Sequence, residues 1–417
     1  MKRYLSMLLI ACCFSMVLAG CNIGKDEETT VRIWFGREDF IPGDRFERFQ
    51  KDNPNIKVEF DVVPLEQAVQ DYLRNYKANN APDIVQVFHD NIGTLVAQDS
   101  LYDMTTELEN WKKEDAEGYD KILKQAWDMA SFKGKPYGMA AHVAPYWHVH
   151  RTDLFKENNL SVPETWDDVI EAADILTDTS KEFYGYSIVG GRAHPPWWFL
   201  SIFKSMGGEH TATGLPMIDS EAGVYLLNFY QKLQKNGSLH PETISWSSGE
   251  MRGAFIGGNT AMIPEADNIY TKINEAMAYE DMWTATVQPY RPGAEADRKT
   301  ALWGWPMVVN KKTSNPEAVK KVLQYMIDTD IVSEVAYRYQ PTTNTEVTQS
   351  AEYVKRKPWA PKFTEELSKT IIMPYHIRQS EVSNILVDAF QEALQKPDAD
   401  AAEMASRYQK LLNALDN

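Results

Sequence analysis

The chain has 417 residues, of which 43% are hydrophobic and 12% aromatic, and its 43 basic and 59 acidic side chains give a net charge of −16. This length and composition predict an ordered protein that is large enough for two domains, and they exclude a disordered chain. The acidic excess repels nucleic acid and anionic lipid, so no nucleic-acid partner is expected.

The first residues indicate secretion. Lys2 and Arg3 precede an apolar run over 7–20. This pattern matches a secretory signal, and the run is shorter than the roughly 20 residues of a membrane-spanning helix. We therefore predict a signal peptide over 1–20, which places the mature chain outside the cytoplasm.

The cysteines predict a lipid anchor. The stretch "LAGC" that ends at Cys21 resembles a bacterial lipobox, in which cleavage precedes a cysteine that becomes diacylated. Two acyl chains are what stable membrane attachment requires. We predict a lipidated Cys21 and a short tether over 21–28, on the extracellular face of the bacterial cell membrane. An ordinary signal peptide followed by an incidental cysteine is the alternative. Cys12 and Cys13 lie in the signal, so no disulfide and no catalytic thiol is predicted.

Hydrophobic periodicity predicts alternating strands and helices after the tether. Apolar residues alternate over 31–35 and again over 56–62, which is the period of a strand. Apolar residues at helical spacing follow each of these runs, around 46–49 and over 65–76. The near-continuous apolar run over 82–88 is typical of a buried parallel strand. The order β-α-β-α-β predicts an α/β fold.

Helix boundary signals continue this pattern along the chain. Thr165 and Asp168 have the spacing of a capping box, and Gly237 is placed to end a helix that precedes it. Asn315 and Pro316 have the types preferred at a helix cap and first helical position. The C-terminal third is predicted to be mostly helical. The fold class is therefore α/β throughout, in two unequal clusters.

Motif searches give no support for catalysis or for a cofactor. His148 and His150 form an H-x-H pair on one face of a predicted strand, close to His142, but nothing nearby supplies a defined third zinc ligand. Hydrolysis of glycosides needs two carboxyl groups at a set distance, and a sequence does not show that distance. The sequence contains no nucleophile elbow, phosphate-binding loop or dinucleotide-binding fingerprint. We predict no metal, no cofactor and no enzyme activity.

The tryptophans suggest a binding site for sugars. Several of the 12 stand beside Pro or Gly: Trp197 and Trp198 follow two prolines, and Trp303 and Trp305 flank Gly304. Prolines fix φ and remove donors, so we predict that these indoles are held at rigid loop positions. An indole offers a large apolar face and one N–H, and the C–H faces of sugars stack on such rings.

Ordered motifs carry a resemblance to a known family. "PDIVQVFHDNIG", "TWDDVIEAA" and "AFIGGNTAM" occur in that order. The mature chain resembles the extracellular solute-binding proteins of ABC importers, family 1, which are similar to maltose-binding protein. The resemblance implies a two-domain periplasmic-binding-protein-like fold with hinge crossovers and a ligand cleft between the domains. It predicts an N-terminal domain over 29–142 plus 305–352 and a C-terminal domain over 143–304 plus 353–417.

The same resemblance implies a set of ligand-binding residues. They lie after the first and third strands, on the aromatic segments, in the stretch "PEAD" and in "MPYHIR". The predicted ligand-binding residues are Trp34, Arg37, Asp90, Asn91, Trp147, Trp197, Trp198, Glu265, Asp267, Trp303, Trp305, Tyr375 and Arg378.

Two departures from the family argue against maltose as the ligand. Ala144 stands where the prototype has a sugar-binding carboxylate, and Asn91 replaces an arginine. We predict a monomeric, lipid-anchored binding protein that delivers a carbohydrate, an oligosaccharide in particular, to membrane permease subunits. One alternative is a polyamine or peptide ligand whose cationic group pairs with Glu265 and Asp267, and another is a glycan-degrading enzyme.

Overall fold

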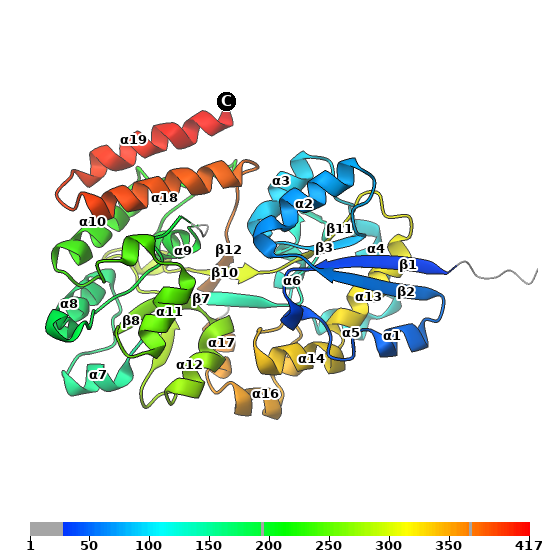
Figure 1. Ribbon diagram of the computed structural model, residues 1–417, viewed down its shortest axis with the longest axis horizontal. Helices are drawn as coiled ribbons and strands as arrows, with labels where there is room; N and C mark the ends of the chain where they lie inside the picture. The colour runs from blue at the N-terminus through cyan, green and yellow to red at the C-terminus, as the bar shows by residue number, and fades with distance from the viewer. Residues whose placement is uncertain (1–27, 193–195, 367–368) are drawn as a thin grey trace, which may run out of the picture.

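The computed structural model describes residues 28–192, 196–366 and 369–417. The predicted signal peptide and Cys21 lie outside these residues. Two α/β bodies stand side by side, each built around its own five-stranded sheet (Figure 1). We call them the N-terminal body, with sheet strands within 29–139 and at 307–309, and the C-terminal body, with sheet strands within 143–304 and at 370–372.

The sheet of the N-terminal body has the order β2-β1-β3-β11-β6. Its strands are β1 (Thr29–Phe35), β2 (Ile56–Val62), β3 (Ile84–Gln86), β6 (Gly138–Met139) and β11 (Met307–Val309). β1 pairs with β2 and β3 in parallel, so the predicted β-α-β-α-β order is confirmed. β11 joins the sheet antiparallel to both β3 and β6, although it is far from them in sequence.

The sheet of the C-terminal body is organised around one long strand. Its strands are β7 (Val143–His150), β8 (Met262–Ala266), β9 (Thr284–Val287), β10 (Thr300–Gly304) and β12 (Thr370–Ile372). All residues of β7 are buried, and β7 pairs antiparallel with β8, β9 and β10. β12 runs parallel to β10 at the edge of the sheet.

Helices cover both faces of each sheet (Figure 1). Those of the N-terminal body are α1 (Glu47–Asp52), α2 (Leu65–Lys77), α3 (Ile92–Ala97), α4 (Thr105–Glu114), α5 (Ala116–Asp120), α6 (Gln125–Asp128), α13 (Pro316–Ile327), α14 (Thr329–Arg338) and α15 (Thr345–Thr348). Those of the C-terminal body are α7 (Thr152–Glu157), α8 (Trp166–Leu176), α9 (Trp197–Ser205), α10 (Glu221–Lys235), α11 (Ser248–Ile256), α12 (Tyr270–Ala276), α17 (Ala360–Glu366), α18 (Gln379–Gln395) and α19 (Ala401–Asn413).

The predicted helix boundaries are confirmed where the sequence carries a cap. Thr165 and Asp168 form a reciprocal capping box at the start of α8. Asn315 caps α13, with Pro316 at its first position. Gly237 has φ of 70°, the left-handed conformation that follows a helix and that glycine adopts without strain.

The loop prediction for the tryptophans is wrong at three of the four positions. Trp197 and Trp198 are the first residues of α9, because Pro196 stands at its N-cap, where a missing N–H breaks no intrahelical bond. Trp303 lies inside β10. Trp305 alone is in a connection, between β10 and β11.

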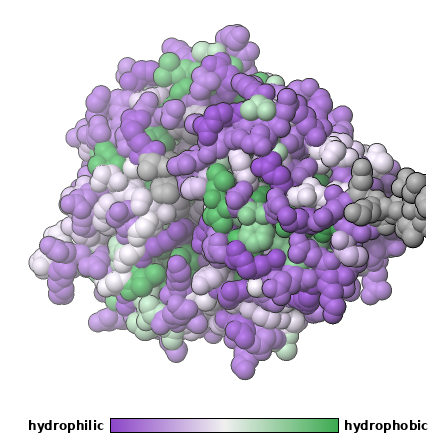
Figure 2. Space-filling model, turned by 45° about the vertical axis from the view of Figure 1, so that its right-hand side comes forward, coloured by the Kyte–Doolittle hydropathy of each residue, from purple (hydrophilic) through white to green (hydrophobic). Residues whose placement is uncertain are grey.

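The chain crosses between the bodies three times. It passes from β6 to β7, from β10 to β11, and through a third segment that carries α16 (Ala351–Arg356) and α17 to β12. In Figure 1 this third segment runs along the lower edge, from α14 through α16 to α17. The face in Figure 2 is mainly hydrophilic, with small apolar areas. Within the three described ranges, no helix has the length and apolarity needed to cross a bilayer.

Two histidines predicted on one strand face are buried in the C-terminal body. His148 and His150 stack with ring centroids 5.9 Å apart on β7, and each is 1% exposed or less. Burial, together with the Lys362 charge, lowers the pKa of His150 to about 3. Burial and its neighbour His150 also lower the pKa of His148. Both imidazoles are therefore neutral, and among the described residues no group of three or more His, Cys, Asp or Glu is placed to hold a metal ion.

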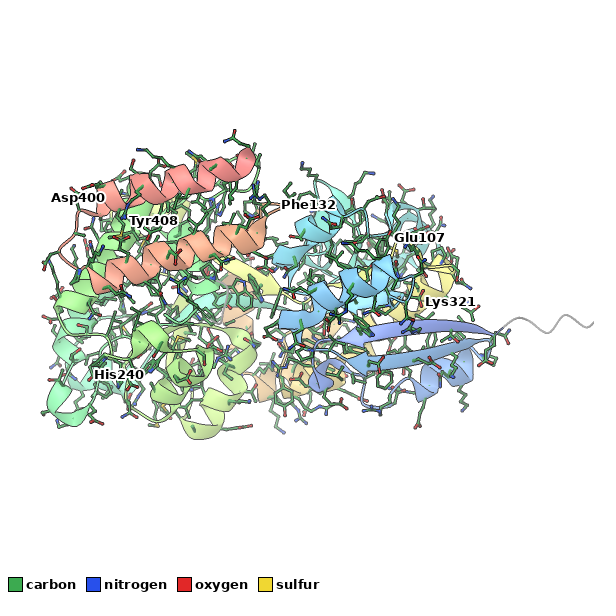
Figure 3. The ribbon with its side chains drawn as sticks, turned by 45° about the horizontal axis from the view of Figure 1, so that its top comes forward. Glu107, Phe132, His240, Lys321, Asp400 and Tyr408 are labelled. Atoms are coloured by element: carbon green, nitrogen blue, oxygen red, sulfur yellow. The ribbon has the colours of Figure 1, made fainter. Side chains whose placement is uncertain are left out.

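We predict that acid destabilises the protein through these histidines. Because the folded pKa of His150 lies below its unfolded value of about 6.5, the unfolded state binds more protons, and stability is lost as the pH falls from about 6.5 toward 3. One such histidine costs roughly 2 kcal/mol at pH 5. Urea unfolding at pH 7.5 and pH 5 checks this. His150→Leu should reduce the loss of unfolding free energy between pH 7.5 and pH 5. His240→Leu, at a partly exposed position (Figure 3), is the control and should not reduce it. An equal loss of unfolding free energy in the two variants would contradict the prediction.

Candidate functional site

A buried carboxylate stands at the carboxyl end of a parallel strand. β3 is followed directly by the short 3-10 helix η2 (His89–Asn91) and then by α3, which places Asp90 at the edge of the sheet where ligands bind in open α/β folds. Asp90 is 3% exposed. Its Oδ1 accepts a hydrogen bond from Asn91 Nδ2 at 2.8 Å, and its Oδ2 accepts one from the indole Nε1 of Trp197 at 3.2 Å. Because Trp197 belongs to the C-terminal body, this contact joins the two bodies.

Aromatic rings from both bodies surround this contact. We call them the aromatic cluster: Phe88, His89, Tyr146, Trp197, Trp198, Trp303 and Tyr375. The ring centroid of Trp197 lies 4.1 Å from that of Trp303 and 4.6 Å from that of Phe88, and the Trp197 and Phe88 rings meet edge to face. The ring centroid of His89 lies 4.2 Å from that of Trp303 and 4.8 Å from that of Tyr375. Ring pairs at these separations stabilise a contact by more than the burial of their apolar surface alone.

A second polar contact joins the bodies next to the cluster. Thr94 Oγ1, on α3, donates a hydrogen bond of 3.0 Å to the carbonyl of Ile377, just before α18. Together with Asp90–Trp197, it shows that the two bodies are in direct contact at this point.

The cluster is nearly free of charge. Burial raises the pKa of Asp90 to about 6, although the Trp197 hydrogen bond opposes this shift. Burial lowers the pKa of His89 to about 3, so its imidazole is neutral. Burial also raises the pKa of Tyr146 and Tyr375 well above the usual value. A site with one carboxylate, neutral donors and ring faces suits a neutral ligand with hydroxyl groups.

Two grooves open beside η2, the 3-10 helix that carries Asp90. The larger, which we call the α2–α18 groove, has a volume of about 460 Å³. It runs between α2 and α3 of the N-terminal body and α18 of the C-terminal body. Its lining residues are Leu65, Glu66, Val69, Gln70, Phe88, Asp90, Asn91, Thr94, Arg192, Gln379, Ser380, Ser383, Asn384 and Val387. Most of its polar groups are amides and hydroxyls, and Arg192 is paired with Asp388.

The smaller groove, of about 290 Å³, lies beside His89. Phe132, from the hairpin formed by β4 (Ser131–Phe132) and β5 (Lys135–Pro136), lines it, together with Tyr375. Figure 3 labels Phe132 at the boundary between the bodies. The aromatic cluster therefore separates two openings that are each walled by both bodies.

Of the thirteen predicted ligand-binding residues, the structure brings six together. Asp90, Asn91, Trp197, Trp198, Trp303 and Tyr375 lie in or beside the aromatic cluster.

Four other predicted residues lie elsewhere and have local partners. Trp34 packs in a separate core cluster of the N-terminal body. Arg37 pairs with the neighbouring Asp39, and Arg378 pairs with Glu381. Trp305 packs against Phe40, with ring centroids 5.5 Å apart, in the crossover after β10.

The remaining three are enclosed in the C-terminal body. Trp147 is 1% exposed and lies opposite Glu265 in the β7–β8 pair. The carboxylate of Glu265 is fully buried and accepts hydrogen bonds from Arg252 Nε at 2.6 Å and Nη2 at 3.1 Å. Asp267 is 1% exposed and accepts a hydrogen bond from Trp359. Both carboxylates are therefore enclosed within the C-terminal body, and neither lines the two grooves beside Asp90.

Sequence reasoning missed Phe88, His89 and Tyr146. Phe88 and His89 directly precede Asp90. Their position next to a predicted ligand-binding residue is a signal in the sequence that points to them. Tyr146 is next to Trp147 on β7, and strand alternation points the two side chains to opposite faces. Nothing in the sequence alone showed which face of β7 meets Trp198 and Trp303.

Comparisons with known proteins agree with this architecture. A model of the family described as bacterial extracellular solute-binding protein matches residues 41–332. A solute-binding protein of an ABC transporter from Thermotoga lettingae TMO, bound with α-D-tagatose, is 20% identical with a TM-score of 0.76, over 93% of this chain and 99% of that chain. One from Agrobacterium radiobacter K84, in complex with ribitol, is 17% identical with a TM-score of 0.77, over 93% and 99%. Maltose-bound MalE3 of T. maritima is 19% identical with a TM-score of 0.77, over 93% and 100%.

The chain therefore belongs to the family of bacterial extracellular solute-binding proteins, and its fold is that of the two-domain periplasmic binding proteins. The predicted resemblance and fold class are confirmed. The family consists of binding proteins, which agrees with the prediction that the chain is not an enzyme.

We predict that Arg252 stabilises the fold by pairing with Glu265. Arg252→Met would leave a fully buried carboxylate without its cationic partner, and we expect a loss of about 3 kcal/mol in the free energy of unfolding. Arg378→Met is the matched control, because its partner Glu381 is exposed, and should cost much less stability than Arg252→Met. Urea unfolding measures both. Equal losses of unfolding free energy for the two substitutions would show that the buried Arg252–Glu265 pair contributes no more to stability than an exposed pair.

Proposed function

We propose that this chain is the ligand-capturing component of an ABC importer and that it binds a carbohydrate or polyol, an oligosaccharide in particular. The observation that carries the proposal is the hydrogen bond between Asp90 and Trp197 within the aromatic cluster, at the contact between the two bodies. Ring faces and a hydrogen-bonded carboxylate at the junction of two domains are what recognition of a hydroxylated ring requires.

The ligands of structurally similar proteins support the chemical class. The proteins from T. lettingae, A. radiobacter and T. maritima are described with α-D-tagatose, ribitol and maltose, which are all neutral polyhydroxy compounds. The ring faces of the cluster suit the C–H faces of such compounds, and Asp90 and the indole N–H of Trp197 suit their hydroxyl groups. Of the two carboxylates that the cationic alternative invokes, Glu265 is paired with Arg252, and Asp267 is buried close to the Lys357 ammonium group.

The α2–α18 groove supports a ligand longer than one sugar. It begins at Phe88, Asp90 and Asn91 and continues between α2 and α18, with a volume of about 460 Å³. Its exposed amides, Gln70 and Asn384, lie on opposite bodies. We infer that sugar units beyond the aromatic cluster lie along this groove and accept and donate hydrogen bonds there.

Capture would proceed by closure of two domains over the ligand. We propose domains over 29–142 plus 305–352 and 143–304 plus 353–417, a division that the membership of the two sheets supports. Bending at the crossovers would open the cleft, and closure would bury the ligand and present both domains to the permease subunits. A monomer suffices for this mechanism, since both walls of the site come from one chain.

The location follows from the N-terminus. We propose that residues 1–20 are removed, that Cys21 is diacylated, and that the protein is held at the extracellular face of the cell membrane near its permease. The segment over 21–28 would then act as the tether.

We predict that Trp197→Ala weakens binding at least tenfold, because it removes a ring face and a donor. The ligand is first found by thermal stability against mono- and oligosaccharides and polyols, with polyamines and peptides as controls; at about 100 times Kd a ligand adds roughly 2.7 kcal/mol of stability. Calorimetric titration then compares Trp197→Ala with Trp34→Ala, which removes an indole outside the site. Unchanged affinity of Trp197→Ala would remove Trp197 from the site. A shift from a polyamine alone, weakened by salt, would replace the carbohydrate with a cation.

We predict that the groove discriminates by ligand length. Gln70→Ala and Asn384→Ala should each weaken binding of tri- and tetrasaccharides by about fivefold, the equivalent of one hydrogen bond, and leave binding of the corresponding monosaccharide unchanged. Asn228→Ala, at an exposed amide on α10, is the control. Equal losses for short and long ligands would contradict a role of the groove in binding distal units.

A further inference from the structure

The third crossover carries three residues with an unusual pattern of burial. Lys357, Pro358 and Trp359 connect α16 to α17. Lys357 and Trp359 are both 0% exposed, whereas Pro358 between them is exposed. A fully buried lysine is rare in proteins unless its ammonium group is hydrogen-bonded.

Trp359 is attached to the C-terminal body. Its indole Nε1 donates a hydrogen bond of 2.5 Å to Oδ1 of Asp267, which follows β8 directly. Its ring packs 5.7 Å from that of Trp283 and 5.9 Å from that of Tyr270. Asp267, which the sequence suggested as a ligand contact, therefore holds the crossover instead.

Lys357 is hydrogen-bonded to the N-terminal body, and its ammonium charge also interacts with the Asp267 carboxylate of the C-terminal body. Its Nζ donates a hydrogen bond of 3.0 Å to the carbonyl of Tyr339, the residue that ends α14. α14 packs against α13, which packs against β1 of the N-terminal body. The ammonium group also lies near His142, in the crossover between β6 and β7. Lys357 is thus hydrogen-bonded to one body and Trp359 to the other, while the Asp267 carboxylate interacts with both residues.

We propose that Lys357, Pro358 and Trp359 form a clip that limits the rotation of the two bodies and favours their contact at the aromatic cluster, so that these residues set ligand affinity without touching the ligand. The proposal rests on the proposed function, since it assigns a role in closure. The Lys357 ammonium group and the Trp359 indole N–H would each lose a hydrogen-bond acceptor if the bodies moved at these points. An unpaired polar group is costly in a low-dielectric interior. Within this crossover, rotation of the bodies therefore falls on the short backbone between the two anchored side chains, where the ring of Pro358 fixes one φ.

Three variants test the clip. Pro358→Ala frees φ and leaves both hydrogen bonds in place. Trp359→Phe removes the bond to Asp267 and keeps an aromatic ring. Trp283→Phe is the matched control: it removes an equally buried indole hydrogen bond, to the carbonyl of Met277, from the same aromatic group but within one body.

Two measurements distinguish an effect on the relative position of the bodies from a general loss of stability. Small-angle X-ray scattering of the ligand-free protein reports the separation of the bodies, and calorimetric titration uses the sugar or polyol that gives the largest thermal shift. We expect Pro358→Ala and Trp359→Phe to increase the radius of gyration and to weaken binding by about three- to tenfold, the equivalent of one hydrogen bond. Trp283→Phe should lower the melting temperature and change neither quantity.

The outcomes are distinguishable from those that test the ligand. If Trp359→Phe and Trp283→Phe lower the melting temperature alike, with scattering and affinity unchanged, the bond to Asp267 is ordinary core packing and the clip is overturned. If Pro358→Ala leaves the scattering unchanged, rotation is not limited at this residue and the clip is also overturned. If no sugar or polyol binds, the proposed function fails, while the scattering of the ligand-free variants still decides whether the clip exists.

Discussion

The hydrogen bond between the Asp90 carboxylate and the Trp197 indole is the contact on which the candidate site depends. A buried carboxylate needs donors, and Asp90 obtains one from its own body, Asn91, and one from the other body, Trp197. Asp90 stands at the end of β3 and Trp197 at the start of α9, so the bond fixes how closely these elements approach. The positions of the rings that pack around Trp197 follow from it.

The placement of charge explains why this junction suits a neutral ligand. In the C-terminal body, Glu265 is paired with Arg252, and the Asp267 carboxylate lies near the ammonium group of Lys357, so a cationic partner within the chain is already close to each of them. Burial keeps His89 neutral. Asp90 thus remains as the ionisable acceptor within the cluster, surrounded by ring faces. Such an arrangement rewards hydroxyl groups and apolar ring faces more than net charge.

Much of the fold could be predicted from the sequence, because periodicity and caps are local properties. The parallel β1, β2 and β3 and the capping box of α8 follow from residue spacing alone. The partners of the tryptophans and carboxylates could not be predicted in this way, since they come from distant segments. Trp197 meets Asp90 across 107 residues, and Trp359 meets Asp267 across 92. The loop predicted for Trp197 and Trp198 is wrong because a proline, which breaks a strand, is tolerated at the start of a helix, and Pro196 is the N-cap of α9.

The same constraint, that buried polar groups must stay paired, acts at the hinge as well as at the site. Phe40 packs on His142 of the first crossover and on Trp305 of the second, and Lys357 of the third crossover is bonded to the end of α14. The bodies therefore cannot move apart at the aromatic cluster without rearranging a packed and hydrogen-bonded interior at the crossovers. A ligand that binds between the bodies gains or loses affinity by the free energy of that rearrangement as well as by its own contacts. In the proposed mechanism, the tryptophans that determine affinity thus include Trp359 at the third crossover as well as Trp197 at the cluster.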